Sequence, residues 1–430
     1  MRFTKLFAAV LCSLAALAAS GQNLRDEIAA NPRKSGGVYY VYTYDNPVLT
    51  PAPKGYKPFY ISHYGRHGSR WLLHDSEYDE VMAVFRAADA ANAFTERGRE
   101  VYGRVKRVYD DGINRGGDLS PLGAEQHREI AGRMYRNFPE VFRSGAVVDA
   151  QATLVVRCVL SMAAFCERLK ELNPRLEVSR TAGRRTTRYL NFYSKPTNPT
   201  LSREYLDFID KGGWQEEYER IGDRFVRPGR LMSELFADGE FVRTIDAQKL
   251  MKGLFYFAAD MQNVGLGISF YDLFTTDELY GLNVYDNYKY YVIRGPSPLN
   301  RRFPQYYAKA LLEDFLTRAD RAVEGGAVSA DGNLMTFVSL LQFEGCDVVE
   351  SDPEKIAQAW PLYRITPMAA NIQLVFYRKK AADDVLVKFL YNEREVRIPV
   401  ASDLAPYYRW NDVRDFYRNV MENLPDPAAK

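Results

Sequence analysis

The chain has 430 residues, of which 47% are hydrophobic, 26% charged and 13% aromatic. These values are typical of a packed globular protein and exclude disordered, collagen-like and low-complexity chains. Lys and Arg number 57 against 55 Asp and Glu, and two of the basic residues, Arg2 and Lys5, lie in a segment that we expect to be removed. A neutral mature protein lacks the positive field of a general nucleic-acid binder, so an anion site must be built from a few placed arginines.

The N-terminus has the pattern of a secretory signal peptide over residues 1–21. A basic start is followed by an apolar run from Leu6 to Ala19 and by small residues up to Gly21. A membrane anchor is the alternative, but about 14 apolar residues are too few to cross a bilayer, and no later stretch is long enough. We therefore expect a periplasmic or secreted protein without a membrane span.

Three cysteines, Cys158, Cys166 and Cys346, remain once the signal peptide is removed. Cys158 and Cys166 lie in one predicted helix about 12 Å apart along its axis, beyond the reach of a disulfide. The spacing of the cysteines and the presence of only four histidines do not indicate a metal site. We expect buried free thiols, no metal and no cofactor.

The first half of the chain predicts an α/β unit. After an irregular lead-in over residues 22–55, a buried strand is expected at Phe59–Ser62, with a turn at 63–70. The segments that follow are predicted in the order helix, helix, helix, strand, helix: Ser76–Phe94, Thr95–Asp110, Ser120–Phe138, Ala152–Val156 and Cys158–Leu172. A strand, crossover helices and a second strand describe a parallel sheet.

The second half predicts a helical insertion and then a return to α/β structure. Residues 180–290 are mainly helical, with the strongest signal at Ala247–Met261. The segments that follow are Gln305–Val323 (helix), Ala327–Ser329, Asn333–Phe343 (helix), three β-rich runs at Asn371–Arg378, Asp384–Tyr391 and Glu395–Val400, and a last helix at Trp410–Met421. The predicted architecture is an α/β core over 22–179 and 291–430, with a mostly parallel central sheet flanked by helices and a mainly helical cap inserted at 180–290.

Residues 63–70, His-Tyr-Gly-Arg-His-Gly-Ser-Arg, carry the chemistry. They place His67 between Arg66 and Arg70 directly after a buried strand, at the end of a sheet where α/β proteins bind ligands. Two guanidinium groups can hold the oxygens of a phosphoryl group, and a neutral imidazole between them can attack phosphorus in line. Gly68 would let the backbone approach the phosphate. A solvated arginine-rich turn is the alternative, but a strand that runs directly into this segment argues against it.

This segment resembles the RHGxR nucleophile motif of the histidine phosphatase superfamily, in its acid phosphatase and phytase branch. Residues 119–126, Leu-Ser-Pro-Leu-Gly-Ala-Glu-Gln, are similar to a second segment of that family, which begins a core helix. Arg157, where a strand meets a helix, resembles the third phosphate-binding arginine. Together with the helical insertion, the layout is most similar to bacterial relatives of multiple inositol polyphosphate phosphatases.

The resemblance also implies a general acid late in the chain, and here the sequence departs from the family. Residues 329–334 match the His-Asp-x-Asn-Leu form, except that Ala330 stands where the histidine belongs, next to Asp331. Asp331 would protonate the leaving alkoxide, and the absent imidazole would have donated to the phosphate. The loss of such a donor costs on the order of 10²–10³ in rate. A second departure is Gln151-Ala152-Thr153, where Arg-Ser-Thr is usual.

Two functions follow from the resemblance. The first is an exported phosphomonoesterase that acts on a small phosphate ester such as an inositol polyphosphate, through a phosphohistidine at His67, with Asp331 as acid and Arg66, Arg70 and Arg157 as phosphate ligands. The second is an impaired pseudophosphatase that binds phosphorylated ligands. A third hypothesis, independent of the resemblance, is a glycan-binding protein, because 30 tyrosines and 24 phenylalanines could form stacking platforms. Such a platform would be contiguous and exposed. The oligomeric state cannot be read from the sequence.

Overall fold

The computed structural model describes residues 23–143, 145–196, 198–324, 334–379 and 384–427, and its main sheet has five strands. Strand β1 (Tyr56–Gly65) pairs with β4 (Asn371–Lys379), and β4 pairs with β5 (Val385–Tyr391). Two short strands, β6 (Arg394–Glu395) and β7 (Tyr407–Arg409), also pair with β5. Each of these pairings is antiparallel.

The prediction of a mostly parallel central sheet is therefore wrong. Strands β4 and β5 follow one another in the chain without a crossover helix, and such neighbours pair as an antiparallel hairpin. The parallel unit is smaller and lies elsewhere: β2 (Val147–Ala152) pairs with β3 (Glu177–Ala182), and α6 (Val156–Leu172) is the crossover between them. The strand predicted at Ala152–Val156 is not formed beyond Ala152. Residues 153–155 make a turn, in which Leu154 is 52% exposed.

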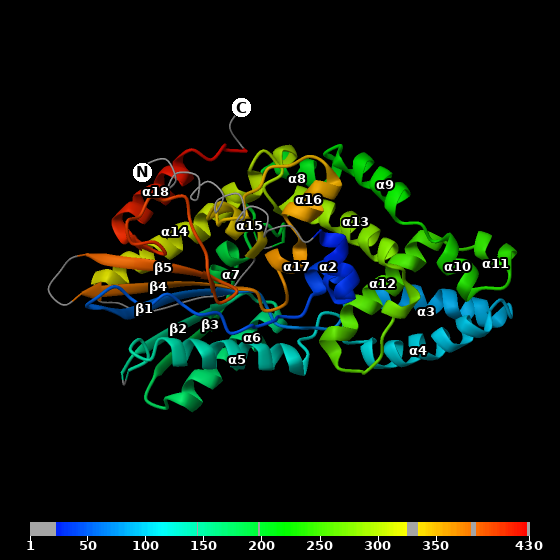
Figure 1. Ribbon diagram of the computed structural model, residues 1–430, viewed down its shortest axis with the longest axis horizontal. Coiled ribbons are helices and arrows are strands. Elements are labelled where there is room, and N and C mark those ends of the chain that lie inside the picture. Colours follow the sequence, from blue (N-terminus) through cyan, green and yellow to red (C-terminus); the bar gives the residue numbers. More distant parts are fainter. Residues whose placement is uncertain (1–22, 144, 197, 325–333, 380–383, 428–430) are drawn as a thin grey trace, which may run out of the picture.

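Helices cover both faces of the main sheet (Figure 1). Helices α14 and α18 lie on one face, and α5 and α6 with the small parallel sheet lie toward the other. The structure confirms the helices predicted for the core, whose observed bounds are α3 (Asp75–Ala90), α4 (Glu96–Gly112), α5 (Pro121–Asn137), α14 (Phe303–Glu324), α15 (Leu334–Leu340) and α18 (Trp410–Glu422). Helix α5 begins as predicted, with Ser120 as the N-cap that accepts from the Gly123 amide.

The opposite end of the molecule is helical. Between Arg184 and Arg294 every described element is a helix: α7 (Arg184–Leu190), α8 (Arg203–Lys211), α9 (Trp214–Phe225), α10 (Gly229–Leu235), α11 (Gly239–Arg243), α12 (Ala247–Val264), η2 (Tyr271–Leu273) and α13 (Thr276–Arg294). Of these, α7 does not lie at the helical end, because it packs against β2, β3 and α14. Helices α3 and α4 join this end, where α3 packs against α12 and α4 against α10 (Figure 1). The helical end thus includes residues from before position 180.

The lead-in is more ordered than the sequence predicts. Asn23 caps α2 (Leu24–Ala30), and Asn31 caps the 3-10 helix η1 (Pro32–Tyr39). Both elements pack against α13, and η1 also packs against α12. Val38 and Tyr39 of η1 are therefore buried. The remaining elements link the two ends: η3 (Pro298–Asn300), α16 (Pro353–Ala359) and α17 (Leu362–Ile365).

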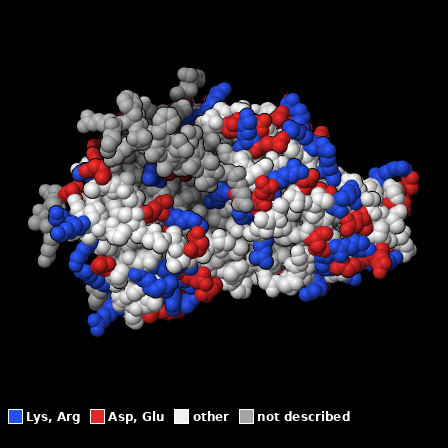
Figure 2. Space-filling view, viewed as in Figure 1, with Lys and Arg blue, Asp and Glu red and all other residues white. Residues whose placement is uncertain are grey.

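The described surface carries both signs of charge. Figure 2 shows Lys and Arg interspersed with Asp and Glu over the face in view. Within the described residues, no helix is both long and apolar enough to cross a membrane.

Candidate active site

The loop that follows β1 is held from two sides. The Arg66 amide donates to the carbonyl of Ala370 at 2.8 Å, and the Ala369 amide donates to the carbonyl of His67 at 3.0 Å. On the other side, the Ser120 amide donates to the carbonyl of Ser69 at 2.9 Å. The loop is therefore fixed between the start of β4 and the start of α5.

Gly68 is required by packing against a helix. A Cβ atom on Gly68 would lie 2.2 Å from the carbonyl oxygen of Gly123, and one on Gly123 would lie 2.1 Å from the carbonyl oxygen of Ser69. Neither position can hold a side chain while the loop rests on α5. The structure thus gives a different reason for Gly68 than the close approach of a phosphate.

A buried hydrogen-bond network centres on Ser69. The Ser69 amide donates to Oε1 of Gln126 at 2.8 Å, and Nε2 of Gln126 donates to Oγ of Ser69 at 2.9 Å. Oγ of Ser69 donates to Oδ1 of Asn263 at 2.7 Å, and Nδ2 of Asn263 donates to the Tyr39 carbonyl at 2.9 Å. The loop is therefore bonded both to α5 and to α12 of the helical end. Asn263 was not among the predicted residues, because nothing near it in sequence marks it.

His67 is a buried histidine whose tautomer follows from its hydrogen bond. Its Nδ1 lies 2.9 Å from the carbonyl oxygen of Gly68, which can only accept, so the proton sits on Nδ1 and the lone pair on Nε2. Burial lowers the pKa of His67 well below its usual value, and Arg66, Arg157 and Arg70 lower it further. The imidazole is therefore neutral at mildly acidic pH.

The three predicted arginines surround His67, and we call Arg66, Arg70 and Arg157 the arginine cluster. Arg66 donates through Nη1 to the carbonyls of Val38 and Thr366, at 2.7 and 2.6 Å. Burial, Arg70 and Arg157 lower the pKa of Arg66 to about 9. Burial also disfavours the charged form of Arg70, but Tyr39 and Asp260 outweigh it and raise the pKa of Arg70.

Arg70 and Arg157 are held by other segments. The Arg70 guanidinium lies 5.0 Å from the centroid of the Tyr39 ring and donates to the Trp71 carbonyl at 2.7 Å. Arg157 lies in the first turn of α6, as predicted, and donates to the Gly117 carbonyl at 3.3 Å. Within the described part of the chain, no carboxylate lies within 4 Å of any member of the cluster.

Asp260 on α12 is the acid that most affects Arg70. It is fully buried, its Oδ2 has no hydrogen-bond partner among the described residues, and burial raises its pKa to about 8 although Arg70 opposes this. Asp260 is therefore largely protonated below pH 8. The arginine cluster keeps its positive charge through the acidic range.

Two further histidines, His63 on β1 and His127 on α5, lie close to Gly65 at the start of the loop. Burial lowers the pKa of His63 to about 3, with a smaller contribution from His127, and burial lowers the pKa of His127 to about 4. The His63 ring stacks on Phe165 with the centroids 4.8 Å apart. Both imidazoles are neutral core groups.

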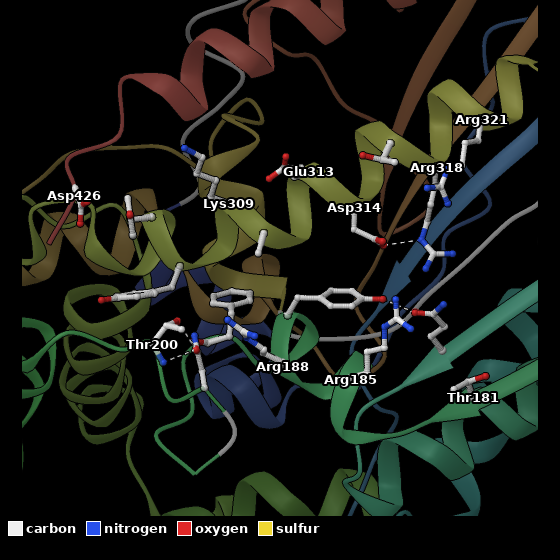
Figure 3. Close-up of a pocket in the computed structure, with 18 residues that line it drawn as sticks. Thr181, Arg185, Arg188, Thr200, Lys309, Glu313, Asp314, Arg318, Arg321 and Asp426 are labelled. Atoms are coloured by element: carbon white, nitrogen blue, oxygen red, sulfur yellow. Dashed lines mark hydrogen bonds and ion pairs between the residues drawn. The ribbon is translucent and has the colours of Figure 1, made fainter. Parts of the chain in front are cut away.

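A separate cavity of about 1020 Å³ lies between α7 and α14 (Figure 3). Arg185 and Arg188 point into this cavity and do not belong to the arginine cluster. Its walls also carry Glu313 and Asp314, and Asp314 is bonded to Arg318 at 2.7 Å. No histidine lines its described walls.

Asp331 and Ala330 lie outside the described residues, so the structure places neither the predicted general acid nor the altered position. Across the residues that the structure covers, no group of three or more His, Cys, Asp or Glu side chains could hold a metal ion.

Comparison with known proteins identifies the fold. No protein-family model and no curated protein matches the sequence. Among solved structures, the multiple inositol polyphosphate phosphatase of Bifidobacterium longum in complex with phosphate matches with a TM-score of 0.77 and 19% identity, over 90% of this chain and 98% of that chain. Its complex with inositol hexasulfate matches with a TM-score of 0.75 and 20% identity, over 88% and 96%. The phytase from D. castellii matches with a TM-score of 0.62 and 14% identity, over 91% and 85%.

The chain has the fold of these phosphatases. The resemblance to the acid phosphatase and phytase branch is thus confirmed at the level of the fold. At these identities the comparison carries the fold alone, and the chemistry depends on the residues around His67.

Proposed function

We propose that the protein is an exported phosphomonoesterase that acts on inositol polyphosphates through a phosphohistidine intermediate. The observation that carries this proposal is a neutral imidazole with a free Nε2, surrounded by three guanidinium groups that have no carboxylate partner among the described residues. Such a site attracts a dianion and leaves the nucleophile unprotonated.

The reaction has two steps. Nε2 of His67 attacks phosphorus, the N–P bond forms as the bond from phosphorus to the ester oxygen breaks, and the alkoxide leaves with a proton from a general acid. Water then attacks the phosphohistidine and releases inorganic phosphate. Arg66, Arg70 and Arg157 bind the three nonbridging oxygens in both steps, where negative charge accumulates.

The general acid in this proposal is Asp331, with Ala330 beside it in place of a histidine. An acid at that position supplies the proton, while the alanine leaves the phosphate with one donor fewer. The proposal therefore includes a lower rate than a complete site would give, by on the order of 10²–10³.

The solved structures support the substrate class. The Bifidobacterium longum enzyme that shares this fold is a multiple inositol polyphosphate phosphatase, described in complexes with phosphate and with inositol hexasulfate. The glycan-binding hypothesis finds no support, because the large hydrophobic side chains exposed on the described surface are all Val or Leu.

Phosphate release by the purified mature protein, between pH 4 and 7, tests the proposal. The panel contains inositol hexakisphosphate, inositol monophosphate and p-nitrophenyl phosphate. His67→Ala should leave less than about 1% of the wild-type rate, because loss of a nucleophile removes the covalent route. Turnover by the variant above that level would exclude the phosphohistidine mechanism.

Ala330→His separates a slow enzyme from a pseudophosphatase. In a slow enzyme the added imidazole should raise kcat/KM about tenfold, which corresponds to about 1.4 kcal/mol of transition-state stabilisation. In a pseudophosphatase it should tighten phosphate binding without turnover. If neither binding nor rate changes, position 330 does not face the phosphate.

Export rests on the basic, apolar and small-residue pattern of residues 1–21, which lie outside the described residues. Mass spectrometry of the protein from its native host should find a mature N-terminus near residue 22. An intact Met1 in the extracellular or periplasmic fraction would contradict cleavage.

A further inference from the structure

Arg66 is held by two segments that lie far apart in the chain. Its Nη1 donates to the carbonyl of Val38 in η1 at 2.7 Å and to the carbonyl of Thr366, directly after α17, at 2.6 Å. These two bonds use both hydrogens of Nη1 and leave the edge formed by Nε and Nη2, which can bind two oxygens of a phosphate. The position of η1 relative to α17 therefore sets the direction of that edge.

One buried carboxylate contacts both segments. Glu27 of α2 is 4% exposed. Its Oε2 accepts from Nζ of Lys34 in η1 at 3.0 Å and from the hydroxyl of Tyr363 in α17, and its Oε1 accepts from Nη2 of Arg364 in α17. The Lys34 ammonium also lies 5.1 Å from the centroid of the Tyr363 ring. Figure 1 shows α2 beside α17, so Glu27 lies where three elements meet.

The donors to Glu27 are close in sequence to the carbonyls that hold Arg66. Val38 is four residues after Lys34, and Thr366 is two residues after Arg364. Hydrogen bonds between oppositely charged groups are the stronger kind, so the carboxylate restrains both cations and the segments that carry them. The positions of the two carbonyls are therefore linked to Glu27 through short pieces of folded chain.

We propose that Glu27 is a positioning residue for Arg66. Its carboxylate fixes η1 against α17, and the two segments then present the carbonyls of Val38 and Thr366 at the spacing that Nη1 requires. This inference rests on the proposed function, in which Arg66 binds phosphate. A guanidinium that is oriented before the ligand arrives binds more tightly, because the ligand does not have to order the long side chain.

A purely structural explanation competes with this proposal. Helix α17 and the end of η1 also contact each other directly, since the rings of Tyr40 and Tyr363 lie 5.5 Å apart and the Met368 amide donates to the Tyr40 carbonyl at 2.8 Å. In this explanation Glu27 only anchors α2. Its loss would then lower the free energy of unfolding and leave the phosphate affinity of the folded protein unchanged.

The test measures binding of inorganic phosphate to the mature protein by calorimetry, with the Tm of each variant recorded to show that it is folded. Glu27→Gln should raise the dissociation constant about fivefold, because the amide keeps the shape of the side chain but loses the charge that restrains Lys34 and Arg364. Tyr363→Phe removes one donor and should raise it about twofold. Asp26→Asn is the matched control: Asp26 is exposed in the same first turn of α2, so this variant removes an equal charge and should not change the affinity.

A double-mutant cycle shows whether the effect passes through Arg66. In an Arg66→Ala background, where Arg70 and Arg157 still bind phosphate, Glu27→Gln should cause no further loss of affinity, since no guanidinium remains to be positioned. An equal loss in both backgrounds, or no loss in the wild-type background, would overturn the proposal. If Glu27→Gln does not fold, Tyr363→Phe takes its place in the cycle and is judged by the same outcomes.

Turnover separates this inference from the proposed function. If the wild type binds inorganic phosphate but hydrolyses no ester, the proposed function fails, and the cycle still decides the role of Glu27. If the wild type hydrolyses esters and its phosphate affinity does not depend on Glu27, the positioning role alone fails. A wild type that does not bind inorganic phosphate would overturn both.

Discussion

The arginines of two regions of the molecule differ in whether they have a carboxylate partner. On α4, Arg104 lies 2.8 Å from Asp272, and in the core Arg133 lies 2.8 Å from Glu393, each within an ion pair. Around His67, the three arginines of the cluster have no described carboxylate within 4 Å, and burial together with neighbouring arginines lowers the pKa of Arg66 and Arg157. Paired arginines stabilise the fold, whereas the cluster holds positive charge ready for an anion. Of these two groups, the arginine cluster is the one that the proposed function uses.

Breaking the buried pair should have the largest effect on stability. In Glu393, which is 3% exposed, Oε1 and Oε2 accept from Arg133, and Oε2 also accepts from Tyr42 at 2.9 Å. Glu393→Gln should lower the free energy of unfolding by about 3 kcal/mol, because it removes the buried carboxylate from Arg133 and leaves only the exposed Glu129, 3.3 Å from Nη1. Urea denaturation measures this loss, and phosphate affinity should stay within about threefold of wild type. A large loss of phosphate affinity would contradict the separation of the two groups of arginines.

Removing a cluster arginine should weaken phosphate binding without lowering stability. Arg157→Gln should weaken phosphate binding about tenfold to a hundredfold, because a hydrogen bond to a charged group contributes roughly 1.5–3 kcal/mol. In phosphate-free buffer its Tm should equal or exceed that of wild type, since burial and Arg70 already disfavour the charged form of Arg157. Arg104→Gln is the control, with phosphate affinity unchanged. A variant that loses stability and keeps its affinity would place Arg157 among the structural arginines.

The two neutral histidines extend the comparison to pH. Below pH 6.5 the unfolded chain binds protons at His63 and His127, but the folded chain does not until about pH 3 and pH 4. Each should therefore lower stability by roughly 1.4 kcal/mol per pH unit as the pH falls through this window. Asp260, whose pKa is raised to about 8, acts in the opposite direction, because its folded form holds the proton more tightly.

The measurement is the stability of His127→Leu relative to wild type, by urea denaturation at pH 7, 6 and 5. Asp260 contributes equally to both proteins, so its effect cancels in the difference between their free energies of unfolding. Between pH 6 and pH 5 this difference should shift in favour of the variant by roughly 1.4 kcal/mol. A difference that does not depend on pH would mean that His127 binds its proton at the same pH in the folded and the unfolded chain, so that burial does not lower its pKa.

Sequence reasoning was accurate where the pattern was local. The strand, the loop that follows it and the start of α5 lie within one continuous stretch. Arg157 was predicted from the resemblance, and it lies in the first turn of α6 although the strand expected directly before it is a turn. It failed where the partner is distant: the direction of the main sheet depends on β4, about 300 residues after β1. Helix α13 was missed because it is buried on most sides and lacks polar–apolar periodicity.

The bond from Ser69 to Asn263 has a consequence for how the molecule opens. The Ser69 residue is fully buried, and its amide is held by Gln126, while its hydroxyl is tied to α12. Deuterium can replace that amide hydrogen only when the loop, α5 and α12 separate together. Exchange at Ser69 should therefore occur with the slowest amides of the protein, and the loop after β1 should behave as part of one cooperative unit that spans both ends.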